Sequence, residues 1–120
     1  MGIRSDVAIC MKARVVEHLA PEIRKFLDEW GFSEREVVKE GDDAGTLFYT
    51  SDVKWYNDSY PSIIAFYRYM EGSHAEDDYL IIEACSEFPD TDGGNAGCWE
   101  DNPWNLYKEV SVSLNWNCTS

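Results

Sequence analysis

The segment from 90 to 95, Asp-Thr-Asp-Gly-Gly-Asn, comes closest in this sequence to a metal-binding pattern, because it begins like a calcium loop. A calcium loop needs oxygen ligands at positions 1, 3, 5 and 12 and a glycine at position 6. Counted from Asp90, position 5 is Gly94, position 6 is Asn95 and position 12 is Asp101. The ligand at position 5, the glycine and the bidentate glutamate are all missing, so we predict no metal site here.

Groups that could act as nucleophiles or bases are few. The chain has two histidines, His18 and His74, and four cysteines, at positions 10, 85, 98 and 118. Their spacing contains no CxxC pattern, and the sequence lacks GxGxxG, P-loop and GxSxG motifs. We therefore predict no enzyme and no cofactor. The alternative is a small hydrolase or metal-dependent enzyme, in which a concave pocket would hold His74 or a cysteine beside a carboxylate.

The segment from Cys98 to Tyr107, CWEDNPWNLY, is the best candidate for an interaction surface because it combines aromatic and acidic residues. Tryptophan and tyrosine are enriched among interface hot spots, and an acidic rim steers a basic partner. The alternative is that both indoles fold inward and fill the core beneath a long loop. The predicted partner-binding residues are Asp90, Asp92, Trp99, Glu100, Asp101, Trp104 and Tyr107.

Net charge narrows the class of partner. The chain carries ten basic and 23 acidic residues, for a formal charge of −13. Residues 1–39 are balanced, whereas residues 40–120 hold three basic and 16 acidic residues. Such a field repels nucleic acid and anionic membranes and attracts basic protein surfaces. We expect a protein partner with a basic surface, no direct nucleic-acid binding and no membrane binding. The oligomeric state stays open, a homodimer being one option.

The start of the chain carries no sign of export. Residues 1–20 include charged side chains throughout and no unbroken apolar run, so no signal peptide is predicted. No stretch approaches the length of a membrane span. Since the chain also begins with Met1, we expect a complete cytoplasmic protein with reduced cysteines.

Two helices are predicted at the start. Apolar residues recur at four-residue steps from Val7 to Leu19, which predicts a helix over 6–19. Pro21 begins a second predicted helix, over 21–30, whose apolar positions also follow helical spacing.

The remaining chain predicts four strands and one helix. Ser33 and Glu36 also fit a capping box for a short helical turn, which is the alternative to the first strand. Residues 86–106 are predicted to form a long irregular loop. The elements are a short strand at 37–38, a strand at 47–56, a helix at 61–70, a strand at 79–85 and a strand at 109–116.

The predicted order is therefore α-α-β-β-α-β-β in a single α+β domain over residues 1–120. The apolar strand at 79–85 is expected at the centre of the sheet. We expect a mainly antiparallel sheet of about four strands with three helices on one face, because the strand at 109–116 alternates apolar and polar residues.

Two segments resemble small uncharacterised proteins encoded by tailed phages and prophages. They are Ser51–Pro61, which reads SDVKWYNDSYP and leads into a helix, and Asp78–Ile82, which reads DYLII. The resemblance covers about a third of the chain and carries no assigned activity or functional residue. It implies an accessory protein in the cytoplasm of an infected bacterium, which would act by binding a host protein.

These observations favour a non-enzymatic acidic protein-binding module, acting as a phage accessory protein that inhibits or modulates a host factor. One alternative is a DNA mimic that occupies the DNA-binding groove of a host nuclease or of a restriction or CRISPR-type defence system. Others are the small enzyme described above and a structural component that assembles into a symmetric oligomer.

Overall fold

The computed structural model describes residues 5–41, 44–55, 60–85, 96–99 and 102–104. No helix in these ranges is both long enough and apolar enough to cross a membrane. The elements in chain order are β1 (Ser5–Lys12), α1 (Ala13–Glu17), α2 (Pro21–Glu29), β2 (Ser33–Val38), β3 (Gly45–Val53), α3 (Pro61–Ser73), the short 3₁₀ helix η1 (Glu76–Asp78), β4 (Tyr79–Cys85) and β5 (Ala96–Gly97).

The described strands form one antiparallel sheet in the order β2-β3-β1-β4-β5, with β1 in the middle. Helices α1 and α2 connect β1 to β2, and helix α3 connects β3 to β4. The first four strands therefore have the connectivity of the split βαβ, or ferredoxin-like, arrangement. The predicted α+β class, antiparallel sheet and three helices are confirmed. The fold class itself assigns no function.

The predicted helix over 6–19 is wrong for most of its length. Residues Ser5–Lys12 form β1, and only Ala13–Glu17 are helical. A four-residue step equals two repeats of a strand, so the apolar spacing from Val7 to Val15 fits both structures. Every residue from Val7 to Met11 is fully buried, as expected of a central strand covered on both faces. The observed order is β-α-α-β-β-α-β-β.

The other boundaries differ less from the prediction. Residues 33–36 belong to strand β2, so the short helical turn proposed there is wrong. Strand β4 occupies the predicted range, but β1 rather than β4 is the middle strand. Strand β5 lies inside the predicted 86–106 loop, and the predicted strand at 109–116 lies outside the described residues.

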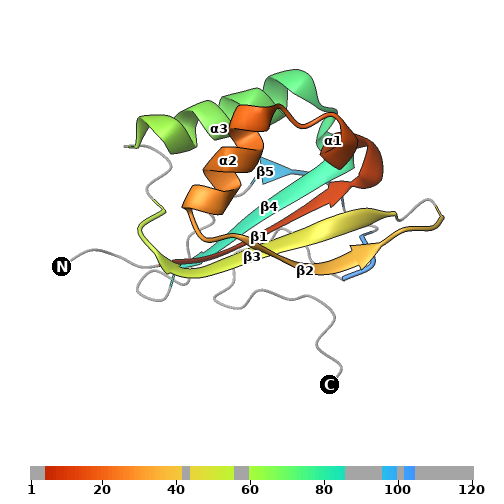
Figure 1. Cartoon of the computed structure of the whole chain (residues 1–120), viewed down its shortest axis with the longest axis horizontal. Helices are drawn as coiled ribbons and strands as arrows, with labels where there is room; N and C mark the ends of the chain where they lie inside the picture. The colour runs from red at the N-terminus through yellow and green to blue at the C-terminus, as the bar shows by residue number, and fades with distance from the viewer. Residues whose placement is uncertain (1–4, 42–43, 56–59, 86–95, 100–101, 105–120) are drawn as a thin grey trace.

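The three helices cover one face of the sheet (Figure 1). Helix α2 begins at Pro21 and buries Ile23, Phe26 and Leu27 against the strands. Phe26 stacks on Phe66 of α3, with ring centroids 4.9 Å apart. Trp55 lies in the same cluster, where its indole N–H donates a 2.8 Å hydrogen bond to the Tyr67 hydroxyl. This aromatic core fixes both helices above the sheet.

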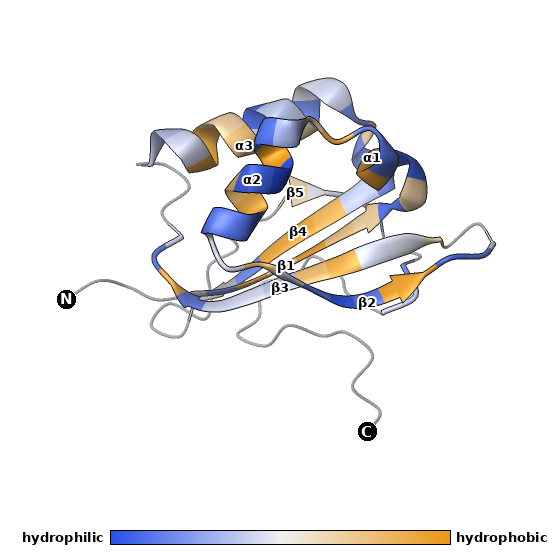
Figure 2. Cartoon of the chain, viewed as in Figure 1, coloured by the Kyte–Doolittle hydropathy of each residue, from blue (hydrophilic) through white to orange (hydrophobic). Residues whose placement is uncertain are grey.

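The opposite face of the sheet is also apolar. Strands β1 and β4 are orange over much of their length in Figure 2, because apolar residues occupy successive positions along them. Ala8, Cys10, Leu47, Leu80 and Ile82 point to this face and form a second buried cluster. The side chains that complete the cluster are Trp99 and Trp104. The helices thus lie on one face of the sheet, as predicted. The second face is also covered, by the indoles of Trp99 and Trp104.

Candidate functional site

A pocket of about 540 Å³ lies where the C-terminal end of α3 meets η1 and the edge of the sheet. Because two glutamates and no lysine or arginine are among its described lining residues, we name it the acidic pocket. Its lining residues are Glu71, His74, Ala75, Glu76, Tyr79, Ala96 and Gly97.

The acidic pocket forms where the chain turns from helix to strand. Helix α3 ends as His74 takes an extended conformation, while the His74 backbone N–H still donates a 3.1 Å hydrogen bond to the Met70 carbonyl. The Asp78 N–H then donates to the Ala75 carbonyl at 3.0 Å, which closes η1. Strand β4 begins directly afterwards with Tyr79. Helix end, turn and strand start are thereby held around one hollow.

Strand β5 closes the acidic pocket from the sheet edge, and Gly97 makes this approach possible. Gly97 has a φ of +80°, a conformation that residues with a Cβ rarely adopt. A Cβ at this position would lie 2.3 Å from the Tyr79 carbonyl oxygen. Only glycine therefore allows β5 to lie this close to Tyr79.

The carboxylates of the acidic pocket have no counter-ion among the described residues. Glu71 and Glu76 are exposed, and neither forms an ion pair with another described residue. Burial raises the pKa of Tyr79 to about 12, and the carboxylates of Glu71 and Glu76 add to the rise. The Tyr79 side chain is only 1% exposed, and its hydroxyl makes no hydrogen bond to a described residue. The pocket therefore presents negative charge beside an unpartnered phenol.

His74 supplies a second unpartnered polar atom. Its Nε2 is buried and has no hydrogen-bond partner among the described residues. The ring packs edge-on against Tyr69, with centroids 5.4 Å apart. Burial lowers the pKa of His74 below 6.5; the Asp78 carboxylate opposes this shift and His18 adds to it. The imidazole is thus mainly neutral at pH 7 and does not cancel the negative charge of the pocket.

An ion-pair cluster of Lys12, Arg14 and Asp78 holds η1 in place. The Arg14 guanidinium donates to both carboxylate oxygens of Asp78, its Nε at 3.0 Å from Oδ2. The Lys12 ammonium lies 3.5 Å from Oδ1. The hydrogen bonds from Arg14 are the main cause that lowers the pKa of Asp78. Asp78 is thus buried and fixes the turn that carries Glu76.

A second hollow, of about 340 Å³, is lined by Lys12, Ala13, Arg14, Gly41 and Ala44. Both of its cationic residues pair with Asp78, so their charge is largely balanced within the fold. A third, of about 160 Å³, lies between α2 and the sheet and holds both acidic and basic side chains. The acidic pocket is the one of these three whose described lining residues include carboxylates and no lysine or arginine.

The structure places two of the predicted partner-binding residues in the core. Trp99 and Trp104 are 3% and 0% exposed, and their rings meet edge-on with centroids 5.8 Å apart. The inward orientation considered as the alternative is the one observed. Their indoles therefore do not form an exposed contact surface in this structure. The other predicted residues, Asp90, Asp92, Glu100, Asp101 and Tyr107, lie outside the described residues.

Sequence reasoning did not select the residues of the acidic pocket as one site. His74 and Glu76 fall between the predicted helix at 61–70 and the predicted strand at 79–85, and Tyr79 is the first residue of that strand. The sequence did offer one signal: the acidic residues 76–78 lie between the end of a predicted helix and the start of a predicted strand. A turn of this kind brings the helix end and the strand start together at one edge of the sheet. Nothing in the sequence indicated that Gly97 would close the site.

Among the described residues, no group of three or more His, Cys, Asp or Glu side chains is arranged to hold a metal ion. Comparisons of the chain with family models, curated proteins and solved structures find no match.

Proposed function

We propose that this chain is a non-enzymatic protein-binding module whose partner presents a basic surface. In the context that the phage resemblance implies, it is an accessory protein that inhibits or modulates a host factor. The observation that carries this proposal is the acidic pocket, in which Glu71 and Glu76 have no described counter-ion. Carboxylates that form no ion pair with a described residue remain available for an external cation.

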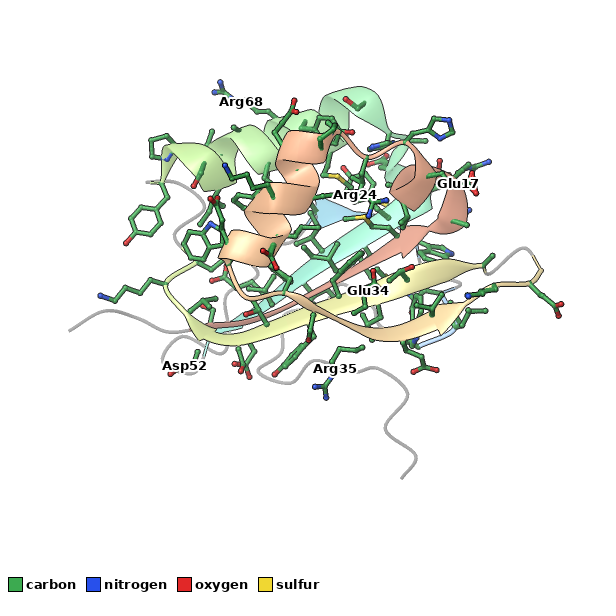
Figure 3. The ribbon with its side chains drawn as sticks, viewed as in Figure 1. Glu17, Arg24, Glu34, Arg35, Asp52 and Arg68 are labelled. Carbon is green, nitrogen blue, oxygen red and sulfur yellow. The ribbon has the colours of Figure 1, made fainter. Side chains whose placement is uncertain are left out.

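The wider charge distribution supports the same proposal. A net charge of −13 draws a basic protein toward the molecule over a distance comparable with the Debye length, about 10 Å at 0.1 M salt. Basic side chains are present but dispersed: Arg68 projects from the outer side of α3 and Arg35 from β2 on the opposite side of the molecule (Figure 3). Encounter would therefore depend on salt, and the acidic pocket offers a place for contact after encounter.

The test is affinity capture from a bacterial lysate, followed by calorimetry with each purified candidate partner. The Glu71→Gln/Glu76→Gln variant removes two charges at the pocket. The Glu29→Gln/Glu36→Gln variant removes two charges from exposed positions on α2 and β2 and serves as the matched control. We expect saturable binding that weakens with salt and weakens more in the pocket variant than in the control. Absence of a saturable partner at every salt concentration would contradict the proposal.

One observation favours a second candidate function, that of a small hydrolase. The acidic pocket places His74 in a hollow with two carboxylates, which is the arrangement that this alternative requires. His74 Nε2 is buried, however, and would have to become accessible before it could take a proton from a substrate. Turnover of a panel of activated esters and phosphoesters, lost in His74→Gln, would favour the enzyme over the binding module.

The DNA-mimic alternative makes a different prediction for the same captured partner. It expects duplex DNA to compete with this chain for that partner, and the competition to disappear at high salt. Many of the acidic residues that a mimic would use lie outside the described residues: Asp42, Asp43, Asp58, Glu87, Asp90, Asp92, Glu100, Asp101 and Glu109.

A further inference from the structure

We propose that the acidic pocket receives one cationic side chain, a lysine or an arginine, presented by the partner protein. This inference rests on the proposed function and specifies the contact that the partner makes. It is carried by the carboxylates of Glu71 and Glu76, which pair with no described cation, together with the hydroxyl of the buried Tyr79, which has no described hydrogen-bond partner.

The hydrogen-bonding groups of the acidic pocket match a ligand that only donates. The carboxylates of Glu71 and Glu76 accept hydrogen bonds, and so can the hydroxyl oxygen of Tyr79. Ammonium and guanidinium groups donate and do not accept, so either could satisfy acceptors that the fold leaves without partners.

The position at the end of α3 adds to the preference for a cation. Helix α3 spans Pro61–Ser73, and Glu71 and His74 lie at its C-terminal end. The carbonyl groups at a helix C-terminus carry partial negative charge and favour cations nearby. The described end of this helix has no lysine or arginine in its last turn. An external cation would thus take a place that a basic residue of the same helix often fills.

The remaining lining residues suit the stem of a long basic side chain. Ala75, Ala96 and Gly97 present small aliphatic or backbone surfaces, and the Tyr79 ring lies beside Gly97. Lysine and arginine bury their methylene groups against such surfaces while the charged end reaches polar groups. A metal ion is a poorer fit, because the described residues hold no cluster of three or more metal-binding side chains.

The first experiment uses the whole chain and three small probes. Backbone amide NMR signals are followed during titration with acetyl-lysine amide, acetyl-arginine amide and acetyl-citrulline amide, the last being a neutral analogue of the arginine probe. We expect the lysine or the arginine probe to shift the amides of residues 74–79 and of Gly97, and citrulline to leave them unchanged. Equal shifts with all three probes, or none, would overturn the inference.

Variants then identify the groups that bind the probe. Glu71→Gln/Glu76→Gln should weaken binding about tenfold, which corresponds to about 1.4 kcal/mol, whereas Glu29→Gln/Glu36→Gln should leave it within about twofold, as for distant surface charges. Tyr79→Phe keeps the buried ring and removes only the hydroxyl, and should weaken binding about threefold or more. Thermal unfolding of each variant confirms that the fold is retained. Unchanged affinity in both the Glu71→Gln/Glu76→Gln and Tyr79→Phe variants would place the cation elsewhere and overturn the inference.

Two outcomes separate this inference from the proposed function. A captured partner that binds Glu71→Gln/Glu76→Gln as tightly as the unaltered chain overturns the pocket contact and leaves the binding module standing. If the probes bind at the pocket but no protein partner binds saturably, the proposal of a protein-binding module is overturned. The proposal that the cation belongs to a protein is then overturned with it. The last experiment is a titration with the diamine putrescine. If putrescine binds much more tightly than acetyl-lysine amide, the ligand of the pocket is a free amine and not a side chain of a partner protein.

Discussion

The backbone N–H of Cys98 donates a 2.6 Å hydrogen bond to the carbonyl oxygen of Glu76. In the next residue, the Trp99 N–H donates to the Tyr79 carbonyl at 3.1 Å. The chain that carries the buried tryptophans is thus attached to the same turn that carries the carboxylate of the acidic pocket. Changes on the tryptophan face of the sheet can therefore reach the pocket through the backbone.

The first prediction concerns Trp104, which we expect to be a core residue rather than a binding residue. Trp104→Ala should lower the free energy of unfolding by about 3–5 kcal/mol, because it removes a fully buried indole and leaves a cavity. Denaturant unfolding of this variant beside Val37→Ala, at an exposed site where about 0.5 kcal/mol is expected, provides the measurement and its control. A loss for Trp104→Ala as small as that of the control would indicate that the indole is not packed as observed.

That prediction changes how a tryptophan variant should be used. A protein with both Trp99 and Trp104 replaced by alanine would lose much of the cover of one sheet face. Loss of partner binding in such a variant would follow from loss of the fold as readily as from loss of a contact. The glutamate variants of the acidic pocket leave the core intact and are the sharper test.

The second prediction compares two glycines with the same backbone conformation. Gly97 and Gly41 have φ values of +80° and +84°, so alanine meets a similar backbone strain at both, about 1 kcal/mol. At Gly41 a Cβ would have nothing within 4 Å, whereas at Gly97 it would lie 2.3 Å from the Tyr79 carbonyl oxygen. We therefore expect Gly97→Ala to destabilise the protein by at least about 1 kcal/mol more than Gly41→Ala.

The same pair of variants tests whether β5 closes the acidic pocket. Gly97→Ala should also weaken binding of the cationic probe, because the backbone must move away from Tyr79. Gly41→Ala should not change probe binding. Equal unfolding free energies for the two variants would contradict the close approach of β5 to β4.

The elements that the sequence predicted correctly are those with one consistent pattern. Residues 79–85 form a strand as expected, since an unbroken apolar run of that length suits few other structures. Pro21 and Pro61 each mark the first residue of a helix, because a proline at that position sacrifices no helical hydrogen bond. Local chemistry was sufficient in these cases.

The wrong assignments share a different cause. The spacing from Val7 to Val15 fits a helix and a two-sided strand equally well, and only pairing with β3 and β4 decides between them. The candidate site was missed for the same reason. Tyr79 and Gly97 come together through pairing of distant segments, which residue types and local spacing do not encode.

The third prediction concerns Asp78, whose carboxylate is nearly buried between Arg14 and Lys12. Asp78→Asn should lower the free energy of unfolding at pH 7 by about 1–2 kcal/mol, a modest value because Arg14 remains largely exposed. Asp77→Asn changes the neighbouring exposed carboxyl and serves as the matched control. An equal effect of the two substitutions would contradict the role of Asp78 in fixing η1.

The pH dependence of this difference has a defined sign. The pKa of Asp78 is lower in the folded chain than the ordinary value of 3.8, so the unfolded chain binds the proton first as pH falls. The stability that Asp78 contributes is therefore fully present above pH 3.8 and is lost as pH falls through the lower folded-state pKa. The gap between the unaltered chain and Asp78→Asn should narrow over that interval in acid unfolding measurements.

The fourth prediction concerns His74 and applies at milder pH. Because the pKa of His74 is lowered in the folded chain, the unfolded chain takes up a proton at this residue first as pH falls below 6.5. The free energy of unfolding should therefore decrease from pH 7.5 to pH 5.5, and the decrease should be smaller in His74→Gln. His18→Gln is the control: it should retain most of the decrease, since burial shifts the pKa of His74 more than His18 does. If His74→Gln and the unaltered chain lose stability equally over this range, the imidazole is not held in the buried position described.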